Sequence, residues 1–160
     1  MSKQIKHFNV RVYGIIINKN NEVLLADEYQ LGMKMTKFPG GGLKFGEGTV
    51  DCLKREALEE FGQEVEVLEH FYTLEYFQPS LFYEDHQLLS IYYKARFIKP
   101  IKFKIYDKPF GRPGELKNGY ISFRWKDLEE LTKEDVSLPV DKKVTKRLIK
   151  QMGTANKNKA

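Results

Sequence analysis

The sequence contains a single cysteine, Cys52, among its 160 residues. One cysteine excludes an intramolecular disulfide and suits a reducing compartment. Long hydrophobic runs are also missing: no stretch reaches the roughly 18 apolar residues that a membrane span requires. Residues 1–8 lack the apolar region of a secretory signal. These absences favour a cytoplasmic protein that does not enter a membrane.

Internal repeats and low-complexity linkers are absent as well. A chain of this length fits one domain with one core, and we expect that domain to span residues 1–152. The 41 % of hydrophobic and 31 % of charged residues are ordinary for a globular protein.

Positive charge is concentrated at the C-terminal end. Residues 141–160 carry seven lysines and arginines against Asp141 alone, which is 7 − 1 = +6. Since the whole chain has a net charge of +5, the other 140 residues sum to 5 − 6 = −1. This distribution argues against a basic nucleic-acid groove. It indicates a solvated helix face followed by a disordered basic tail at residues 153–160.

Acidic residues and glycines gather in one stretch, residues 41–63, which read GGLKFGEGTVDCLKREALEEFGQ. The periodicity predicts a helix over 49–61 that begins near Gly48 or Thr49 and ends at Gly62. Its predicted apolar stripe is Val50, Leu53, Ala57 and Phe61.

Glu59 and Glu60 follow Glu56 by three and four residues on this helix, so the three glutamates project from one side. Clustered carboxylates suit Mg²⁺ or Mn²⁺, and because no histidine lies nearby, zinc is disfavoured. Arg55 is placed to pair with Glu59 or with Glu47.

The stretch resembles the Nudix (MutT-like) box, G-x5-E-x7-R-E-U-x-E-E-x-G-U, in which U is a bulky apolar residue. The stretch departs from this pattern only at the two U positions, which are Ala57 and Gln63. All the other specified positions agree: Gly41, Glu47, Arg55, Glu56, Glu59, Glu60 and Gly62. The resemblance implies a metal-dependent hydrolase that cleaves the diphosphate linkage of a nucleoside diphosphate derivative by water attack on phosphorus.

The resemblance also implies roles for individual residues. Glu56 and Glu59 would be catalytic, with Glu56 as the favoured general base and Arg55 orienting a glutamate. The metal ligands would be Glu56, Glu59 and Glu60, with Glu47 as a further or water-bridged ligand. The glycines would belong to the diphosphate site, where they let backbone N–H groups approach a phosphate: Gly40, Gly41 and Gly42.

The expected fold is α+β, and the resemblance sharpens it to an α/β/α sandwich with a mixed β-sheet flanked by helices. Residues 18–21 are predicted to join two strands, 8–17 and 22–27, into a hairpin, and residues 38–42 to break regular structure. Further predicted strands are 65–77, 88–98, 120–125 and, as a shorter candidate, 103–106. Predicted helices are a short one at 128–131 and a last one at 140–152.

Substrate signals come from residues after the box. Pro79 lies sixteen residues beyond Gln63, a spacing that resembles Nudix enzymes acting on ADP-ribose and other ADP-sugars; the alternative is a simple turn. Glu84, Asp85 and Glu115 are candidates for an additional base or ligand from later loops, and the alternative is a surface position for each.

Three other functions remain open at this stage. They are a nucleoside triphosphate pyrophosphohydrolase, an RNA 5′-end pyrophosphohydrolase that uses the basic tail, and a non-catalytic nucleotide-binding regulator with the same fold. The resemblance also makes a homodimer an expectation.

Overall fold

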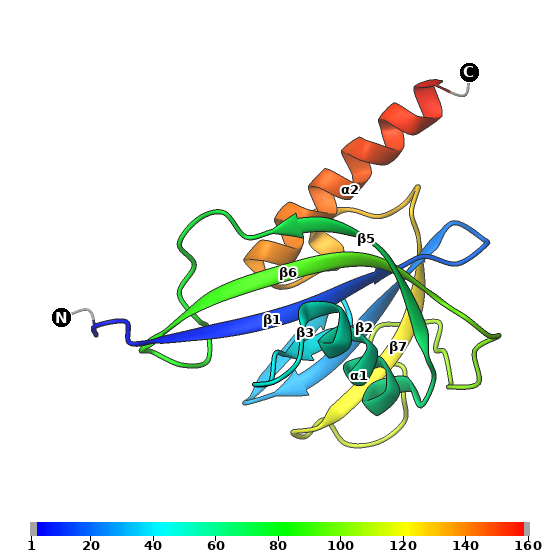
Figure 1. The fold of residues 1–160 in the computed structure, drawn as a ribbon. Helices are drawn as coiled ribbons and strands as arrows, with labels where there is room; N and C mark the ends of the chain where they lie inside the picture. Colours follow the sequence, from blue (N-terminus) through cyan, green and yellow to red (C-terminus); the bar gives the residue numbers. More distant parts are fainter. Residues whose placement is uncertain (1–2, 159–160) are drawn as a thin grey trace. The chain divides into compact units, whose positions relative to one another are not determined.

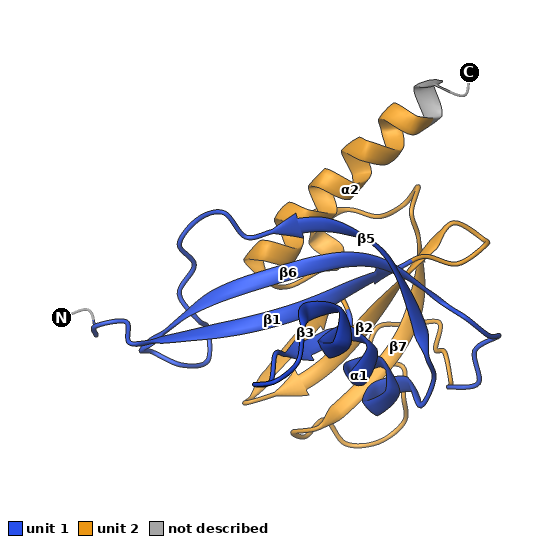
Figure 2. Cartoon of the chain, in the orientation of Figure 1, with its two compact units in different colours: residues 1–16, 39–103 blue, residues 17–38, 104–160 orange. Residues whose placement is uncertain are grey.

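A computed structural model describes residues 3–158 of the chain (Figure 1). Its residues divide into two compact units that alternate along the sequence (Figure 2). Unit 1 comprises residues 1–16 and 39–103, and unit 2 comprises residues 17–38 and 104–160. The predicted single domain over 1–152 stays a prediction.

Unit 1 is built on a mixed four-stranded sheet in the order β4-β1-β6-β5. Its strands are β1 (His7–Ile16), β4 (Gly40–Gly42), β5 (Val65–Thr73) and β6 (His86–Phe97). β1 runs parallel to β6, whereas β4 and β5 are antiparallel to their neighbours. The β-branched and aromatic residues of β1 explain its strand form, and its second half is buried.

Helix α1 (Thr49–Phe61) packs on this sheet against β4, β5 and β1. The Asp51 carboxylate accepts a hydrogen bond from the Gly48 N–H (3.3 Å) and so caps the start of the helix. Gly62 ends it in the left-handed conformation, with φ 65°. The predicted stripe is wrong at one position, because Val50 is 37 % exposed and Cys52 is buried instead.

Unit 2 contains a three-stranded antiparallel sheet in the order β3-β2-β7. The strands are β2 (Glu22–Gln30), β3 (Met33–Lys37) and β7 (Tyr120–Asp127), followed by the short 3₁₀ helix η1 (Lys133–Asp135). Asp27 and Arg124 form a buried ion pair between β2 and β7, with Arg124 Nε 2.9 Å from Asp27 Oδ2.

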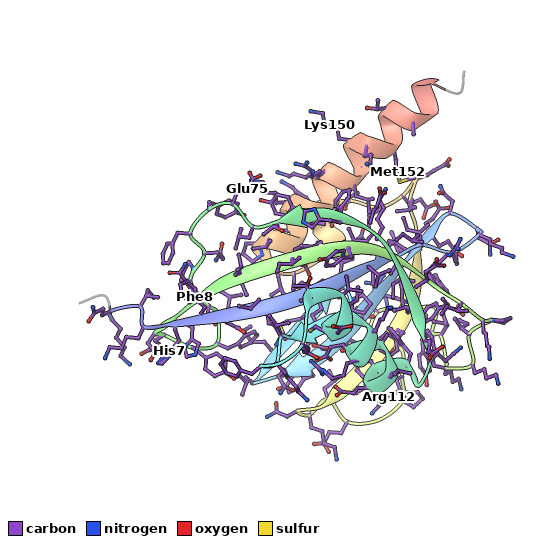
Figure 3. All side chains as sticks on the ribbon, in the orientation of Figure 1. His7, Phe8, Glu75, Arg112, Lys150 and Met152 are labelled. Atoms are coloured by element: carbon purple, nitrogen blue, oxygen red, sulfur yellow. The ribbon has the colours of Figure 1, made fainter. Side chains whose placement is uncertain are left out.

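Helix α2 (Pro139–Asn158) closes the chain and buries Val140, Val144 and Leu148 at four-residue spacing. It continues past Met152, where the sequence predicted its end; Lys150 and Met152 lie along its later turns (Figure 3). Residues 153–158, predicted to be disordered, are therefore helical in this structure, and residues 159–160 of the predicted tail lie outside the described residues.

Several strand predictions differ from the structure. The predicted hairpin is reduced to its turn, with Asn18 N–H donating to the Glu22 carbonyl (3.0 Å), and to one antiparallel bridge between Ile17 and Val23, because β1 and β2 enter different sheets. Residues 40–42 form a strand although glycines predicted a break. The short strand at 103–106 is reduced to one bridge between Ile105 and Phe123, and residues 128–131 are not helical.

The α+β class with mixed sheets and flanking helices is confirmed. Within residues 3–158, no helix combines the length and the apolar character needed to span a membrane.

Candidate active site

The strand β4 consists of three glycines at the edge of the unit 1 sheet. It pairs with β1 in the register Gly42 with Arg11, Gly41 with Val12 and Gly40 with Tyr13. The flanking Leu43 N–H donates to Val10 O (2.9 Å), and Gly14 N–H donates to Pro39 O (2.8 Å). Hydrogen-bonded and non-hydrogen-bonded residue pairs alternate along an antiparallel ladder. Gly41, which is opposite Val12, is therefore the glycine that is hydrogen-bonded to β1. The N–H groups of the other two glycines face away from β1.

Two of these positions leave no room for a side chain while the neighbouring groups stay in place. Gly40 has φ 154°, and a Cβ there would lie 2.1 Å from the Val12 carbonyl oxygen. A Cβ on Gly41 would lie 2.2 Å from both Cδ and Oε1 of Glu56. The Glu56 carboxylate on α1 therefore rests directly on the backbone of β4.

Arg55 joins the box carboxylates to each other and to β4. Its Nε and Nη2 donate to the two oxygens of Glu47 (2.9 and 2.7 Å). Its Nη1 donates to Glu56 Oε1 (3.0 Å) and to Glu59 Oε1 (3.1 Å). Nη2 also donates to the Gly42 carbonyl (2.9 Å). Both pairings that the sequence left open for Arg55, with Glu47 and with Glu59, occur together.

The pKa of Glu47 is lowered to about 2, chiefly by its hydrogen bonds from Arg55 and further by the backbone N–H of Lys44. Conversely, Glu47 is the main reason that the pKa of Arg55 lies well above its ordinary value. Glu47 is thus a fixed anion whose two oxygens are occupied. A metal-ligand role for Glu47 would have to use a lone pair that these hydrogen bonds leave, since each carboxylate oxygen has two.

The donor set suits a hard divalent cation. Three carboxylates, Glu47, Glu56 and Glu59, share one guanidinium, and Lys44 pairs only with Glu59, so acidic groups outnumber basic ones around Arg55. Only oxygen donors take part, as Mg²⁺ and Mn²⁺ prefer. Within residues 3–158, no three acidic, histidine or cysteine side chains form a ready-made metal cluster, and Arg55 lies among the carboxylates.

Glu60, the remaining predicted ligand, follows Glu59 on α1 and is partly exposed. Cys52 is buried on the same helix, with Sγ 3.5 Å from the Gly42 carbonyl oxygen. Burial, followed by the nearby Glu47, raises the pKa of Cys52 to about 11. A protonated buried thiol agrees with the packing role that the sequence indicated.

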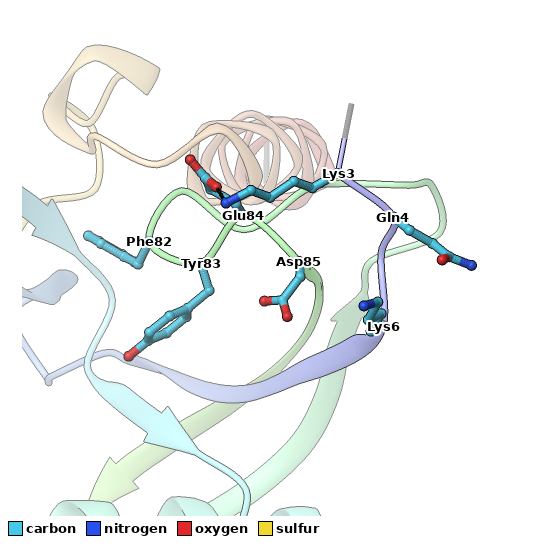
Figure 4. Close-up of a pocket in the computed structure, with 7 residues that line it drawn as sticks. All are labelled: Lys3, Gln4, Lys6, Phe82, Tyr83, Glu84 and Asp85. Atoms are coloured by element: carbon cyan, nitrogen blue, oxygen red, sulfur yellow. Dashed lines mark ion pairs between the residues drawn. The ribbon is translucent and has the colours of Figure 1, made fainter. Parts of the chain in front are cut away.

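The later candidates lie apart from the box along β1. Glu84 and Asp85 line a pocket with Lys3, Gln4 and Lys6, and Glu84 pairs with Lys3 (Figure 4). This pocket adjoins the start of β1, about 13 Å along the strand from the part that pairs with β4, at roughly 3.3 Å per residue. The exposed Pro79 forms a bridge with Gln87.

Glu115 is exposed and belongs to unit 2. Its proposed role, like those of Pro79 and Glu84, stays a prediction. The sequence patterns did not point to Arg11 as a residue of this site. Its Nη1 lies 3.5 Å from the position that a Cβ on Gly42 would take. The available signal was an arginine between two valines of a predicted strand.

The family model of the NUDIX domain matches residues 7–148, which is most of the chain. The chain belongs to the NUDIX family. With its box glutamates complete, it is a Nudix pyrophosphohydrolase. Enzymes of this family generally use divalent cations and act on small nucleotides.

Solved structures show the same fold at low sequence identity. A MutT protein from Methanosarcina mazei Go1 has a TM-score of 0.65 and 18 % identity, with 91 % of this chain and 96 % of that chain covered. A NUDIX hydrolase from Nitrosomonas europaea has a TM-score of 0.63 and 19 % identity, covering 88 % and 87 %. A structure from work on MutT of Aliivibrio salmonicida and Vibrio cholerae has a TM-score of 0.57 and 20 % identity, covering 90 % and 98 %. No curated protein matches the chain.

Proposed function

We propose that this Nudix enzyme hydrolyses the diphosphate linkage of a nucleoside diphosphate derivative with Mg²⁺ or Mn²⁺. The observation that carries the proposal is the junction at Arg55, which contacts Glu47, Glu56, Glu59 and the Gly42 carbonyl at once. A carboxylate helix and a glycine strand that can approach a phosphate are thereby held together.

In this proposal, Glu56, Glu59 and Glu60 hold the cation, and Glu47 contributes through water or by orienting Arg55. When bound, the divalent cation would supply counter-charge to the diphosphate and acidify the attacking water. The outward N–H groups of Gly40 and Gly42 are suited to bind phosphate oxygens, whereas Gly41 supports Glu56.

Glu56 is the favoured general base. Its Oε1 accepts a hydrogen bond from Arg55, so a proton from the attacking water would be taken up at Oε2. The carboxylate lies close to the backbone of Gly41 and accepts the Arg55 hydrogen bond, which favours a fixed geometry for the proton transfer. Glu59 is more exposed, at 52 % of its side chain, and suits a ligand role.

The candidate substrate class is a nucleoside diphosphate linked to a second moiety, with ADP-ribose and other ADP-sugars first because of Pro79. This assignment rests on the spacing of Pro79 from the box. The structure adds that Pro79 and the pocket at Glu84 belong to the same unit as the box.

The test is a substrate panel. The purified protein is incubated with Mg²⁺ or Mn²⁺ and with ADP-ribose, other nucleoside diphosphate sugars, nucleoside triphosphates or 5′-triphosphorylated RNA, and the products are separated and identified. Cleavage of the diphosphate sugars to two monophosphates supports the proposal. Turnover of triphosphates alone would replace the substrate class and reduce Pro79 to a turn residue, and turnover of RNA alone would favour a 5′-end role.

Cytoplasmic location and a homodimer accompany this proposal as predictions. The first rests on the single cysteine and the second on the family resemblance.

A further inference from the structure

We propose that Arg11 binds the diphosphate of the substrate at the outer edge of β4, on the face of the strand opposite α1. This inference rests on the proposed function, because it names a substrate-binding residue of that same site.

The position of Arg11 follows from the register of β1 and β4. Arg11 is opposite Gly42 in a pair that does not share ladder hydrogen bonds, and in such pairs the side chains lie close together. Because residue 42 has no side chain, the guanidinium of Arg11 reaches over the face of β4 at Gly42, with Nη1 3.5 Å from the position that a Cβ would take.

The side chains of Arg11 and Glu56 lie on opposite faces of β4. A Cβ on Gly41 would meet Glu56, and successive residues of a strand point to opposite faces. Gly42 therefore faces Arg11, just as Gly40 faces Tyr13, whose Cδ1 is 2.9 Å from the position of a Cβ there. A phosphate at the edge of β4 would have carboxylates on one side and a guanidinium on the other.

Aromatic packing holds Arg11 in this place. Its Nε donates to the Tyr13 hydroxyl (3.3 Å), and its guanidinium carbon lies 5.9 Å from the centre of the Tyr13 ring. Tyr13 is only 4 % exposed and packs on Tyr92, with ring centres 5.2 Å apart. A guanidinium supported in this way loses little side-chain entropy when it binds an anion.

The site also needs a second cation. Arg55 already donates to three carboxylates, and the Lys44 ammonium lies 3.9 Å from Glu59 Oε1. A diphosphate carries more negative charge than one divalent cation neutralises when carboxylates share that cation. Arg11 brings a second guanidinium to β4, and the planar shape of this group matches phosphate oxygens.

The experiment measures binding of inorganic pyrophosphate by isothermal titration calorimetry in the presence of Mg²⁺. It compares the wild type with Arg11→Gln, Arg11→Lys and the control Arg96→Gln. Arg96 is on β6 of the same sheet, 60 % exposed and paired with Glu66. We expect Arg11→Gln to weaken binding by about tenfold or more, Arg11→Lys to fall between, and the control to match the wild type.

Kinetics on a substrate from the panel give a second readout. Loss of Arg11 should raise KM by a similar factor, with kcat within about threefold, because the contact is made in both the bound and the transition state. Thermal unfolding of each variant checks the fold, and Arg11→Lys keeps the test valid if Arg11→Gln unfolds.

Unchanged pyrophosphate affinity in Arg11→Gln would overturn the inference, as would a wild type that binds no pyrophosphate. Failure of the proposed function has a different signature, since the wild type would then turn over no diphosphate compound. An active wild type with an unchanged KM in Arg11→Gln removes Arg11 from the site and leaves the proposed function standing.

Discussion

The carboxylate of Glu56 rests on the backbone of Gly41, where an added Cβ would lie within 2.2 Å of Cδ and Oε1. A side chain at residue 41 and Glu56 in its present place exclude each other. The glycine that begins the box is therefore a steric requirement of the glutamate fifteen residues later.

Gly41→Ala should displace the Glu56 carboxylate and lower kcat by about 10²-fold, because small misplacements of reacting groups cost that much. Steady-state kinetics measure the rate, and circular dichroism checks that the fold is retained. The matched control is Gly41→Ala in a Glu56→Ala background. In that background Gly41→Ala should lower kcat little further. If the two changes lowered kcat additively, the contact between residue 41 and Glu56 would not be the cause.

Acid should remove a stabilising contribution that comes from Glu47. Its folded pKa of about 2 lies below the ordinary value of 4.5, so the contribution is complete above pH 4.5 and is lost as the pH falls toward 2. Urea unfolding in EDTA, at several pH values, would compare the wild type with Glu47→Gln. The difference in the free energy of unfolding between the wild type and Glu47→Gln should shrink as the pH falls from 4.5 toward 2. A difference that stays constant with pH would rule out the Arg55 contact as its source.

Cys52 should resist thiol reagents in the folded protein. It is fully buried and its pKa is raised to about 11, so almost no thiolate exists near pH 8. Ellman's reagent added at pH 8 should react slowly with the native protein and at once after unfolding in guanidinium. A fast reaction without unfolding would show that the thiol is accessible or ionised.

The buried pair of Asp27 and Arg124 should matter for stability in unit 2. Asp27 also accepts hydrogen bonds from Thr36 Oγ1 (2.6 Å) and from the Phe110 N–H (3.2 Å). Asp27→Ala leaves the guanidinium buried without its partner, which should cost about 3–5 kcal/mol in urea unfolding. The exposed Asp107→Ala is the control and should stay within about 0.5 kcal/mol. Equal effects of the two changes would contradict the prediction.

Local patterns predicted α1 well. The spacing of its glutamates, a start at Gly48 or Thr49 and the stop at Gly62 are properties of neighbouring residues, and the observed helix spans Thr49–Phe61 as expected. The pairing of Arg55 was also accessible, because residues four apart on a helix are neighbours.

Strand pairing could not be predicted in the same way. The turn after β1 forms, yet β1 pairs with β4 and β6 and not with β2, a choice that depends on residues far along the chain. The glycines of β4 have low strand propensity and are held by β1. β3 was missed because MKMTK contains two lysines, one of which, Lys37, is buried beside Glu28 (Nζ to Oε2 3.2 Å). Arg11 was missed for the same reason, since its neighbour Gly42 is thirty-one residues away.

We propose above that the carboxylates of α1 support metal-dependent diphosphate hydrolysis. The most direct measurement is the rate of ADP-ribose hydrolysis, or of the best substrate in the panel, by the wild type and Glu60→Gln with Mg²⁺, and by the wild type with EDTA. We expect kcat to fall by orders of magnitude in folded Glu60→Gln, EDTA to abolish turnover and added Mg²⁺ to restore it. An unchanged rate in Glu60→Gln with Mg²⁺ present would contradict the proposal.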